Sequence, residues 1–201
     1  MSSVHVNAIV YIWYPEDEKM GHAALYIGDP LSRMALDLPF DAFHSKQARQ
    51  MHREYIERHN TNYVSWWPEK AAGAFNRIRQ GRNFFLEEDI ESEQADPHVV
   101  YKIRGLDELA MNRAWESIRS KPGAHYQFLR KNCATVVMRI LRAGGALQRL
   151  PPIQRGWFSH SLYVTPKNIA QVGNGLRDAG WAQKVKDRYC PSKQGFNFGL
   201  R

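Results

Sequence analysis

The pattern of apolar positions divides the chain into short strands and amphipathic helices. Runs of β-branched and aromatic residues, and segments that alternate between apolar and polar residues, are typical of strands. Four such segments are predicted to share one sheet: residues 6–13, 22–28, 62–67 and 99–104. Weaker strand signals are found at residues 34–38, 83–86 and 162–164.

Apolar residues that recur every three or four positions predict helices. Three segments have this pattern: residues 108–120, 133–143 and 167–179. We therefore expect an α+β domain in which the helix at 133–143 packs against an antiparallel sheet.

Charged or loop-forming segments separate these elements. A strongly charged helical insertion is expected near residues 43–60. The acidic run at 87–96 is interpreted as a solvated loop, with a docking site for a basic partner as the alternative. Residues 151–157 also have loop character, and the basic tail from Lys184 onward is expected to pack poorly. Because no repeat, low-complexity tract or linker divides the chain, residues 1–201 are predicted to form one domain.

Length and composition are those of a globular protein. The chain has 201 residues, of which 43% are hydrophobic, and this is enough to bury a sizeable core. No apolar run reaches the ~18 residues of a membrane span, and residues 1–7 lack the basic and apolar regions of a signal peptide. We therefore expect no transmembrane segment and synthesis in the cytoplasm, with a signal-independent route if the protein acts elsewhere.

The net charge of +8 favours an anionic partner, such as nucleic acid, a membrane surface or a cell-wall polymer. No RNA- or DNA-binding motif is recognisable, so no specific nucleic acid is expected. Three histidines, His44, His52 and His59, lie in the charged insertion, but no cysteine or carboxylate joins them in a ligand pattern. The sequence therefore predicts no metal site.

Cys133 is predicted to lie in the first turn of the helix at 133–143 and to face inward. Four apolar residues follow it at helical spacing: Val136, Val137, Ile140 and Leu141. Asn132 is a suitable N-cap, because its side-chain oxygen can accept a backbone N–H of the first turn. The partial positive charge of a helix N-terminus favours a thiolate, as a cysteine nucleophile requires. A buried cysteine that only fills space is the alternative.

A nucleophilic cysteine needs a base, which can come from a distant part of the chain. His22 begins the alternating segment at 22–28, where His22, Ala24 and Tyr26 share one face. The second cysteine, Cys190, has no evident base. Two cysteines are too few for a disulfide framework, so both are interpreted as free thiols.

Two of these segments carry a resemblance to a known superfamily. GHAALYIG at residues 21–28, followed far downstream by Tyr126 and then by the pair Asn132-Cys133 at a helix start, resembles the circularly permuted papain-like, NlpC-type superfamily. That superfamily includes peptidoglycan hydrolases and lecithin:retinol acyltransferase-like enzymes, and in its permuted members the histidine strand precedes the cysteine helix. The segments YVSWWP, RGLDELAMNRAW and NCATVVMRILRAGG also make the chain similar to effector toxins of the type VI secretion class.

The resemblance implies that Cys133 is the nucleophile and that His22 is its general base. It also implies a third polar group, on the strand after the histidine strand, that orients the imidazole. Ser65 takes this position here, where many relatives have His, Asn, Gln or an acid. Asp37 and Asp41 are the alternatives if residues 34–38 form the next strand.

Tyr126 matches a tyrosine that helps to stabilise the oxyanion in related enzymes, although a purely structural aromatic is the alternative. The backbone N–H of Cys133 would be the other donor, and Asn132 is placed with Tyr126 in the oxyanion and substrate region. Acyl transfer through such a site requires no metal and no organic cofactor.

The expected function is cleavage of an amide bond by a cysteine hydrolase, specifically a peptidoglycan amidase or endopeptidase that acts as a secreted antibacterial effector in the periplasm of a target cell. Such an effector would have a secretion-apparatus carrier and a cognate immunity protein as partners. The alternatives are an acyltransferase, a phospholipase or a protein deamidase with the same Cys-His arrangement, and a binding module without activity.

Overall fold

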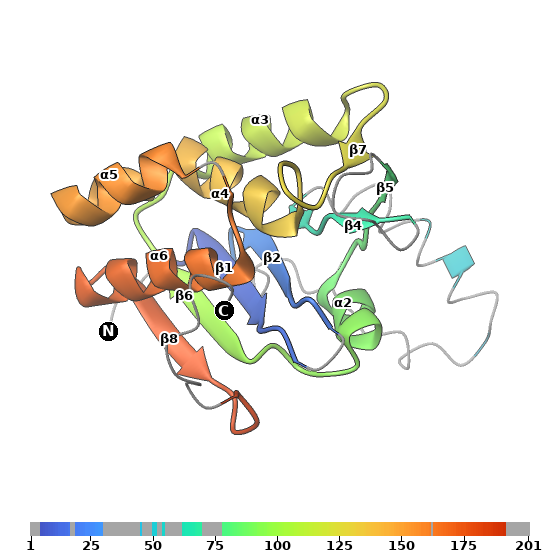
Figure 1. Cartoon of the computed structure of the whole chain (residues 1–201), viewed down its shortest axis with the longest axis horizontal. Coiled ribbons are helices and arrows are strands. Elements are labelled where there is room, and N and C mark those ends of the chain that lie inside the picture. Colours follow the sequence, from blue (N-terminus) through green and yellow to red (C-terminus); the bar gives the residue numbers. More distant parts are fainter. Residues whose placement is uncertain are drawn as a thin grey trace.

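The computed structural model describes residues 5–16, 19–29, 62–69, 78–161 and 163–191, together with Ser45, Gln50, Met51 and Glu54. This part of the chain is a mixed α and β structure in which helices cover an antiparallel sheet (Figure 1). The predicted strand at 34–38, Asp37, Asp41 and most of the predicted insertion at 43–60 lie outside the described residues.

The larger sheet has five strands in the order β3-β2-β1-β6-β8, and all neighbours are antiparallel. The strands are β1 (Ala8–Trp13), β2 (His22–Ile27), β3 (Tyr63–Val64), β6 (Val99–Ile103) and β8 (Ala182–Lys186). The four segments predicted to share a sheet all contribute to it. β8 was not predicted, because its half-exposed, lysine-containing sequence has no apolar face; it pairs with β6, so residues 184–186 are not a loosely packed tail.

A smaller sheet of three strands has the order β4-β5-β7. Its strands are β4 (Trp67–Pro68), β5 (Ile78–Gly81) and β7 (His125–Tyr126). The predicted strand at 62–67 is therefore divided between two sheets, since Ser65 and Trp66 lie between β3 and β4. The predicted strand at 83–86 is wrong: β5 ends at Gly81, and a helix begins at Leu86.

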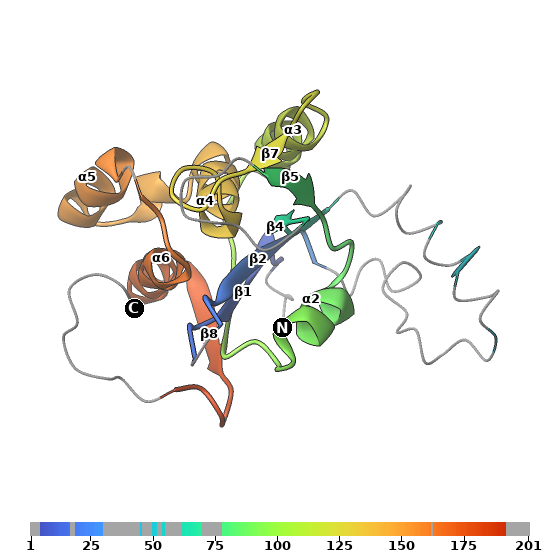
Figure 2. The same cartoon turned by 45° about the vertical axis from the view of Figure 1, so that its right-hand side comes forward.

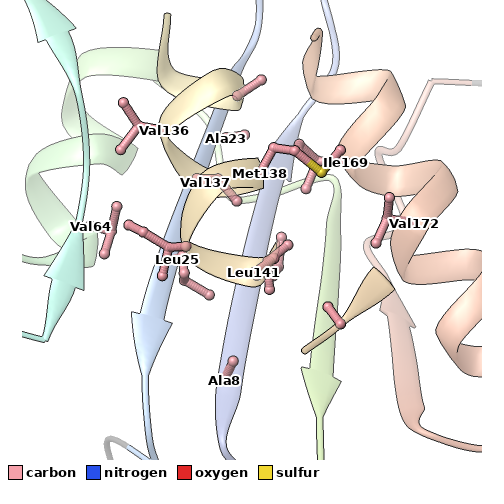
Figure 3. Close-up of a cluster of buried hydrophobic side chains, with 14 of the residues drawn as sticks. Ala8, Ala23, Leu25, Val64, Val136, Val137, Met138, Leu141, Ile169 and Val172 are labelled. Atoms are coloured by element: carbon pink, nitrogen blue, oxygen red, sulfur yellow. The ribbon is translucent and has the colours of Figure 1, made fainter. Parts of the chain in front are cut away.

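Three helices cover one face of the large sheet and enclose the main core: α4 (Cys133–Ala143), α6 (Pro166–Asp178) and α3 (Glu108–Arg119), which packs on α4. The bounds predicted for α4 are confirmed, and those for α3 and α6 agree within one residue. Figure 3 shows Val137 and Leu141 of α4 beside Leu25 of β2, with Ile169 and Val172 of α6 on the other side. Each buried aliphatic side chain of this kind contributes roughly 1.5–3 kcal/mol.

The other face of the sheet is covered by α2 (Leu86–Glu93), which lies on the opposite side of the sheet from α6 (Figure 2). Aromatic residues of β1, β2 and β3 pack there against Leu86 and Ile90. The interpretation of residues 87–96 as a solvated loop is therefore wrong. Three acidic residues of α2, namely Glu88, Asp89 and Glu93, are buried.

Two further corrections concern the segment between α4 and α6. Residues 151–157 are predicted as a loop, but 152–157 fall in α5 (Pro152–His160), with Pro151 as its N-cap. This helix follows the short 3-10 helix η3 (Leu147–Arg149). Tyr163 and Val164 are not in a strand, and Leu162 lies outside the described residues. Within the described residues, no helix has both the length and the apolar character needed to cross a membrane.

Candidate active site

His22 is held at the start of β2 by the glycine that precedes it. Gly21 has a φ of +74°, a backbone conformation that L side chains rarely adopt. A Cβ on Gly21 would lie 2.6 Å from the carbonyl oxygen of Trp13 and 2.7 Å from the nitrogen of Pro15, so only glycine fits. The tight backbone approach allows His22 to pair with Trp13 at the end of the β1-β2 ladder.

Cys133 is the first residue of α4, and Asn132 is its N-cap, as predicted. The Asn132 side-chain oxygen accepts the backbone N–H of Thr135 at 2.8 Å. The two N–H groups of its amide donate to the carbonyl oxygens of Phe128 at 2.8 Å and Val164 at 3.0 Å. Asn132 thus joins the helix start to two neighbouring loops. Because its amide donors are already engaged, any share in oxyanion binding would come from its backbone.

A buried carboxylate lies next to His22. His22 Nε2 is 3.3 Å from Asp89 Oδ2, and the two residues are 1% and 0% exposed. Four other side chains donate hydrogen bonds to the same carboxylate: Tyr63 at 2.5 Å, Ser65 at 2.8 Å, Trp67 at 2.8 Å and Asn83 at 2.7 Å. With these donors Asp89 can remain ionised inside the protein, where an unpaired charge would be very costly.

The pKa of Asp89 is lowered even though burial alone would raise it, because the charge of His22 and the donated hydrogen bonds outweigh the burial. The pKa of His22 moves in the opposite sense, to about 10. Burial favours the neutral imidazole, but the charges of Asp89 and Cys133 and hydrogen bonds to both residues outweigh it. The arrangement therefore favours an imidazolium beside the ionised carboxylate of Asp89.

The orientation of the imidazole is fixed by aromatic rings. The ring of Trp67 stacks on it with a centroid distance of 4.3 Å and an interplanar angle of 22°, and the ring of Trp13 lies at 5.6 Å. Since Nε2 faces Asp89, Nδ1 is the ring nitrogen left for the thiol of Cys133. The structure thus brings together His22 of β2, Cys133 of α4 and Asp89 of α2.

Ser65 lies next to His22, with its Oγ 3.3 Å from Nε2, but it lies between β3 and β4 and not on a strand as the sequence predicted. Its hydroxyl proton is donated to Asp89, so towards His22 the oxygen can only accept. Ser65 and Asp89 therefore contact the same imidazole nitrogen, and the carboxylate is the charged partner. Sequence reasoning missed Asp89. The signal was its position between Leu86 and Ile90, which places a carboxylate on the apolar stripe of a helix.

Two tyrosines lie near the thiol. The pKa of Tyr126 is raised by burial first and then by the charge of Cys133, and that of Tyr163 is raised for the same two reasons. Tyr126, proposed from the sequence as an oxyanion donor, is buried in β7. Tyr163, in the segment before α6, was not identified from the sequence.

Cys190 has different surroundings. It is partly buried, packs against the edge of the main core, and its Sγ is a weak donor to the Pro191 carbonyl oxygen at 3.8 Å. Burial raises the pKa of this thiol.

Among the described residues, no three His, Cys, Asp or Glu side chains are grouped as a metal site would require. His44, His52 and His59 lie outside the described residues.

Comparison with known proteins shows that the sequence of this chain is similar to parts of bacterial proteins. Residues 76–194, more than half of the chain, match the family model of the IcsB middle domain. This range includes Asp89 and Cys133 and begins after His22. The chain is also 37% identical over 115 residues to a multifunctional-autoprocessing repeats-in-toxin protein of Vibrio cholerae, over 55% of this chain. It is 28% identical over 179 residues to the protein of the same name from Vibrio vulnificus, over 82% of this chain.

The matched regions make up only 2% and 3% of the lengths of the two Vibrio proteins, so the chain corresponds to a small part of each. The chain is thus related to sequences within bacterial toxins. Since the family model matches more than half of its residues, the chain belongs to the IcsB middle domain family.

Proposed function

We propose that the chain is a cysteine-dependent acyl-transfer enzyme with Cys133 as nucleophile, His22 as general base and Asp89 as the group that orients His22. The observation that carries this proposal is the buried contact of one imidazole with a carboxylate on one side and a thiol on the other. These are the roles that a nucleophile, its base and a third orienting group have in acyl transfer.

In the proposed mechanism the proton of the Cys133 thiol resides on His22, and the thiolate attacks the carbonyl carbon of an amide or ester. The imidazolium then protonates the leaving group as the tetrahedral intermediate collapses to a thioester on Cys133. An acceptor, either water or another nucleophile, loses a proton to His22 and attacks the thioester carbonyl. The C–S bond then breaks, the acyl product leaves, and the starting pair of Cys133 thiolate and His22 imidazolium is restored. Asp89 keeps its charge throughout and stabilises the imidazolium.

The charge on the carbonyl oxygen needs donors. The backbone N–H of Cys133 at the start of α4 is one, and the helix N-terminus favours negative charge there. The hydroxyl of Tyr126 is the second, since it lies close enough for the charge of Cys133 to affect its pKa. A donor of this kind is typically worth about 3 kcal/mol of transition-state stabilisation.

The permuted papain-like arrangement is part of this proposal. It is supported by the chain order, in which the histidine strand β2 precedes the cysteine helix α4, and by the packing of α4 against the antiparallel sheet. Ser65 is a second contact of the imidazole, and its hydroxyl also holds Asp89 in place.

We propose hydrolysis of an amide bond in peptidoglycan as the first activity to test, in a toxin delivered to the periplasm of a target cell. The relation to toxin sequences and the net charge of +8, which suits an anionic polymer, support it. Delivery as a type VI secretion effector, with a carrier and an immunity protein, belongs to the same proposal.

Transfer of an acyl group to an acceptor other than water is the second candidate. The observation that favours it is the burial of the nucleophile, since Cys133 is only 6% exposed. A site that excludes water protects a thioester from hydrolysis until an acceptor such as an amine binds.

A trapping experiment tests the proposal. The protein is incubated either with muropeptides or with an activated acyl ester, with and without a primary amine, and is analysed by intact mass and peptide mapping. We expect a hydroxylamine-sensitive acyl group on Cys133, present in Cys190→Ala as the matched control and absent in Cys133→Ala. Cleaved muropeptides identify the hydrolase, and amine-dependent product identifies the transferase. Acylation that persists in Cys133→Ala would overturn the proposal.

A further inference from the structure

A second feature lies beside the turn that precedes α4 and takes no part in the proposed chemistry. A cavity of about 370 Å³ is formed by the end of α3, the turn after it, β7 and the outer face of α4. Its size is at the lower end of the roughly 300–1,000 Å³ typical of small-ligand sites. The cavity therefore suits a compact molecule rather than an extended polymer.

The lining of this cavity is basic. Lys121, Arg130, Lys131 and Arg139 contribute four cationic side chains, and His125 also lines the cavity. No carboxylate is among the described residues that line it. The nearby Glu116 of α3 forms an ion pair with Arg119, so that carboxylate is already engaged.

The cationic side chains crowd one another. The pKa of Lys131 is lowered, first by burial and then by the charges of Arg139 and Lys121. Such mutual repulsion is relieved when an anion with several charges binds among the cations. Arginine forks bind phosphate oxygens in pairs, and lysine supplies point charges.

The backbone holds two of these cations in position. Within the turn that precedes α4, the N–H groups of Arg130 and Lys131 both donate to the carbonyl oxygen of Gln127, at 3.2 and 2.8 Å, and the N–H of Gln127 donates to the carbonyl oxygen of Lys131 at 3.1 Å. The Lys131 ammonium also lies 5.0 Å from the centroid of the Trp66 ring. The turn is thus ordered without a ligand, which reduces the entropic cost of binding one.

We propose that the cavity lined by Lys121, Arg130, Lys131 and Arg139 binds a small ligand that carries several phosphate groups. The phosphates can belong to a soluble polyphosphorylated molecule or to the headgroup of a lipid, since the same cations recognise both. This inference does not depend on the proposed acyl transfer, because none of the four residues belongs to the set of His22, Asp89 and Cys133.

Calorimetry with inositol hexakisphosphate at physiological ionic strength is the soluble arm of the test. Sedimentation with phosphatidylcholine vesicles, with and without phosphatidylinositol bisphosphate, is the lipid arm. The variant Lys121→Glu/Arg139→Glu reverses two exposed charges of the cavity. The matched control Lys102→Glu/Lys186→Glu makes the same change on the exposed side chains of β6 and β8.

We expect saturable binding in one arm, and the arm in which it occurs identifies the source of the phosphates. The cavity variant should bind at least about tenfold more weakly, while the control stays within about twofold and Cys133→Ala binds as the unmodified protein does. No binding in either arm would overturn the proposal. Equal weakening in both charge variants would also overturn it, because net charge alone would then explain binding. The same would follow if a single-stranded RNA oligonucleotide bound more tightly than either phosphate probe.

Discussion

The two faces of the large sheet are buried by different kinds of contact. The face under α4 and α6 is apolar: Leu25 and Val64 of the sheet meet Val137 and Leu141 of α4 (Figure 3). The face under α2 combines aromatic packing with a buried carboxylate that has five side-chain contacts. The comparison shows how one sheet can separate the contacts that stabilise the fold from those that set the charge of the candidate site.

Removing the charge under α2 is the change with the largest expected effect on activity. Asp89→Asn keeps the shape of the side chain but no longer stabilises an imidazolium, so we expect kcat to fall by roughly 10³- to 10⁴-fold, as in other triads. Activity with the acyl donor that labels Cys133 is the measurement. Glu91→Gln, an exposed acid on the same helix, is the control and should keep full activity. If Asp89→Asn kept as much activity as the control, Asp89 would have no role in the mechanism.

A change on the apolar face should have the opposite profile. Leu141→Ala leaves a cavity between α4 and the sheet, and we expect it to lower the free energy of unfolding by about 2–5 kcal/mol. Below its unfolding temperature the variant should keep its activity, because no polar contact of the site is lost. Urea denaturation together with an activity assay on the folded protein tests both statements. A specific loss of activity without a loss of stability would contradict the separation of the two faces.

The charge of His22 also predicts how stability depends on pH. Since its pKa is about 10 in the folded protein and roughly 6.5 when unfolded, its contribution is fully present below pH 6.5 and is lost as the pH rises towards 10. The free energy of unfolding should therefore fall between pH 7 and about pH 9. Denaturation at a series of pH values, compared with His22→Gln, isolates this effect. An equally steep fall in the variant would mean that other groups cause it.

Ser65→Ala should have the smallest effect. The hydroxyl contributes one of several hydrogen bonds to Asp89 and one contact with His22, so we expect a three- to tenfold loss of turnover, or about 1 kcal/mol. The fold should be unaffected, which thermal unfolding monitors. If Ser65→Ala lost as much activity as Asp89→Asn, the serine rather than the carboxylate would be the main partner of His22.

The parts of the fold that could be predicted from the sequence are those in which local pattern and tertiary contacts agree. The bounds of α4 follow from its apolar spacing, the capping residue Asn132 and the glycine at its end. The strands β1, β2 and β6 lie in the centre of the sheet, and their sequences are correspondingly apolar.

The parts that were missed depend on what surrounds them. The position of Asp89 on the apolar stripe of α2 can be read from the run itself, but its hydrogen-bond donors come from other segments, such as Tyr63 and Trp67, and only the fold brings them to it. β8 is an edge strand whose exposed lysines hide its pairing with β6. The candidate pair His22 and Cys133 could be proposed from the chemistry of the two residues alone. Asp89 could be identified as the charged partner of His22 only once the fold was known.

The most direct test of the account is the rate at which iodoacetamide labels each cysteine as a function of pH. Because His22, supported by Asp89, can take the thiol proton, we expect Cys133 to react far faster than Cys190 at mildly acidic pH. Both His22→Gln and Asp89→Asn should slow the labelling of Cys133 at that pH and leave the rate at Cys190 unchanged. Faster labelling of Cys190, or labelling of Cys133 that is insensitive to both substitutions, would contradict the proposed site.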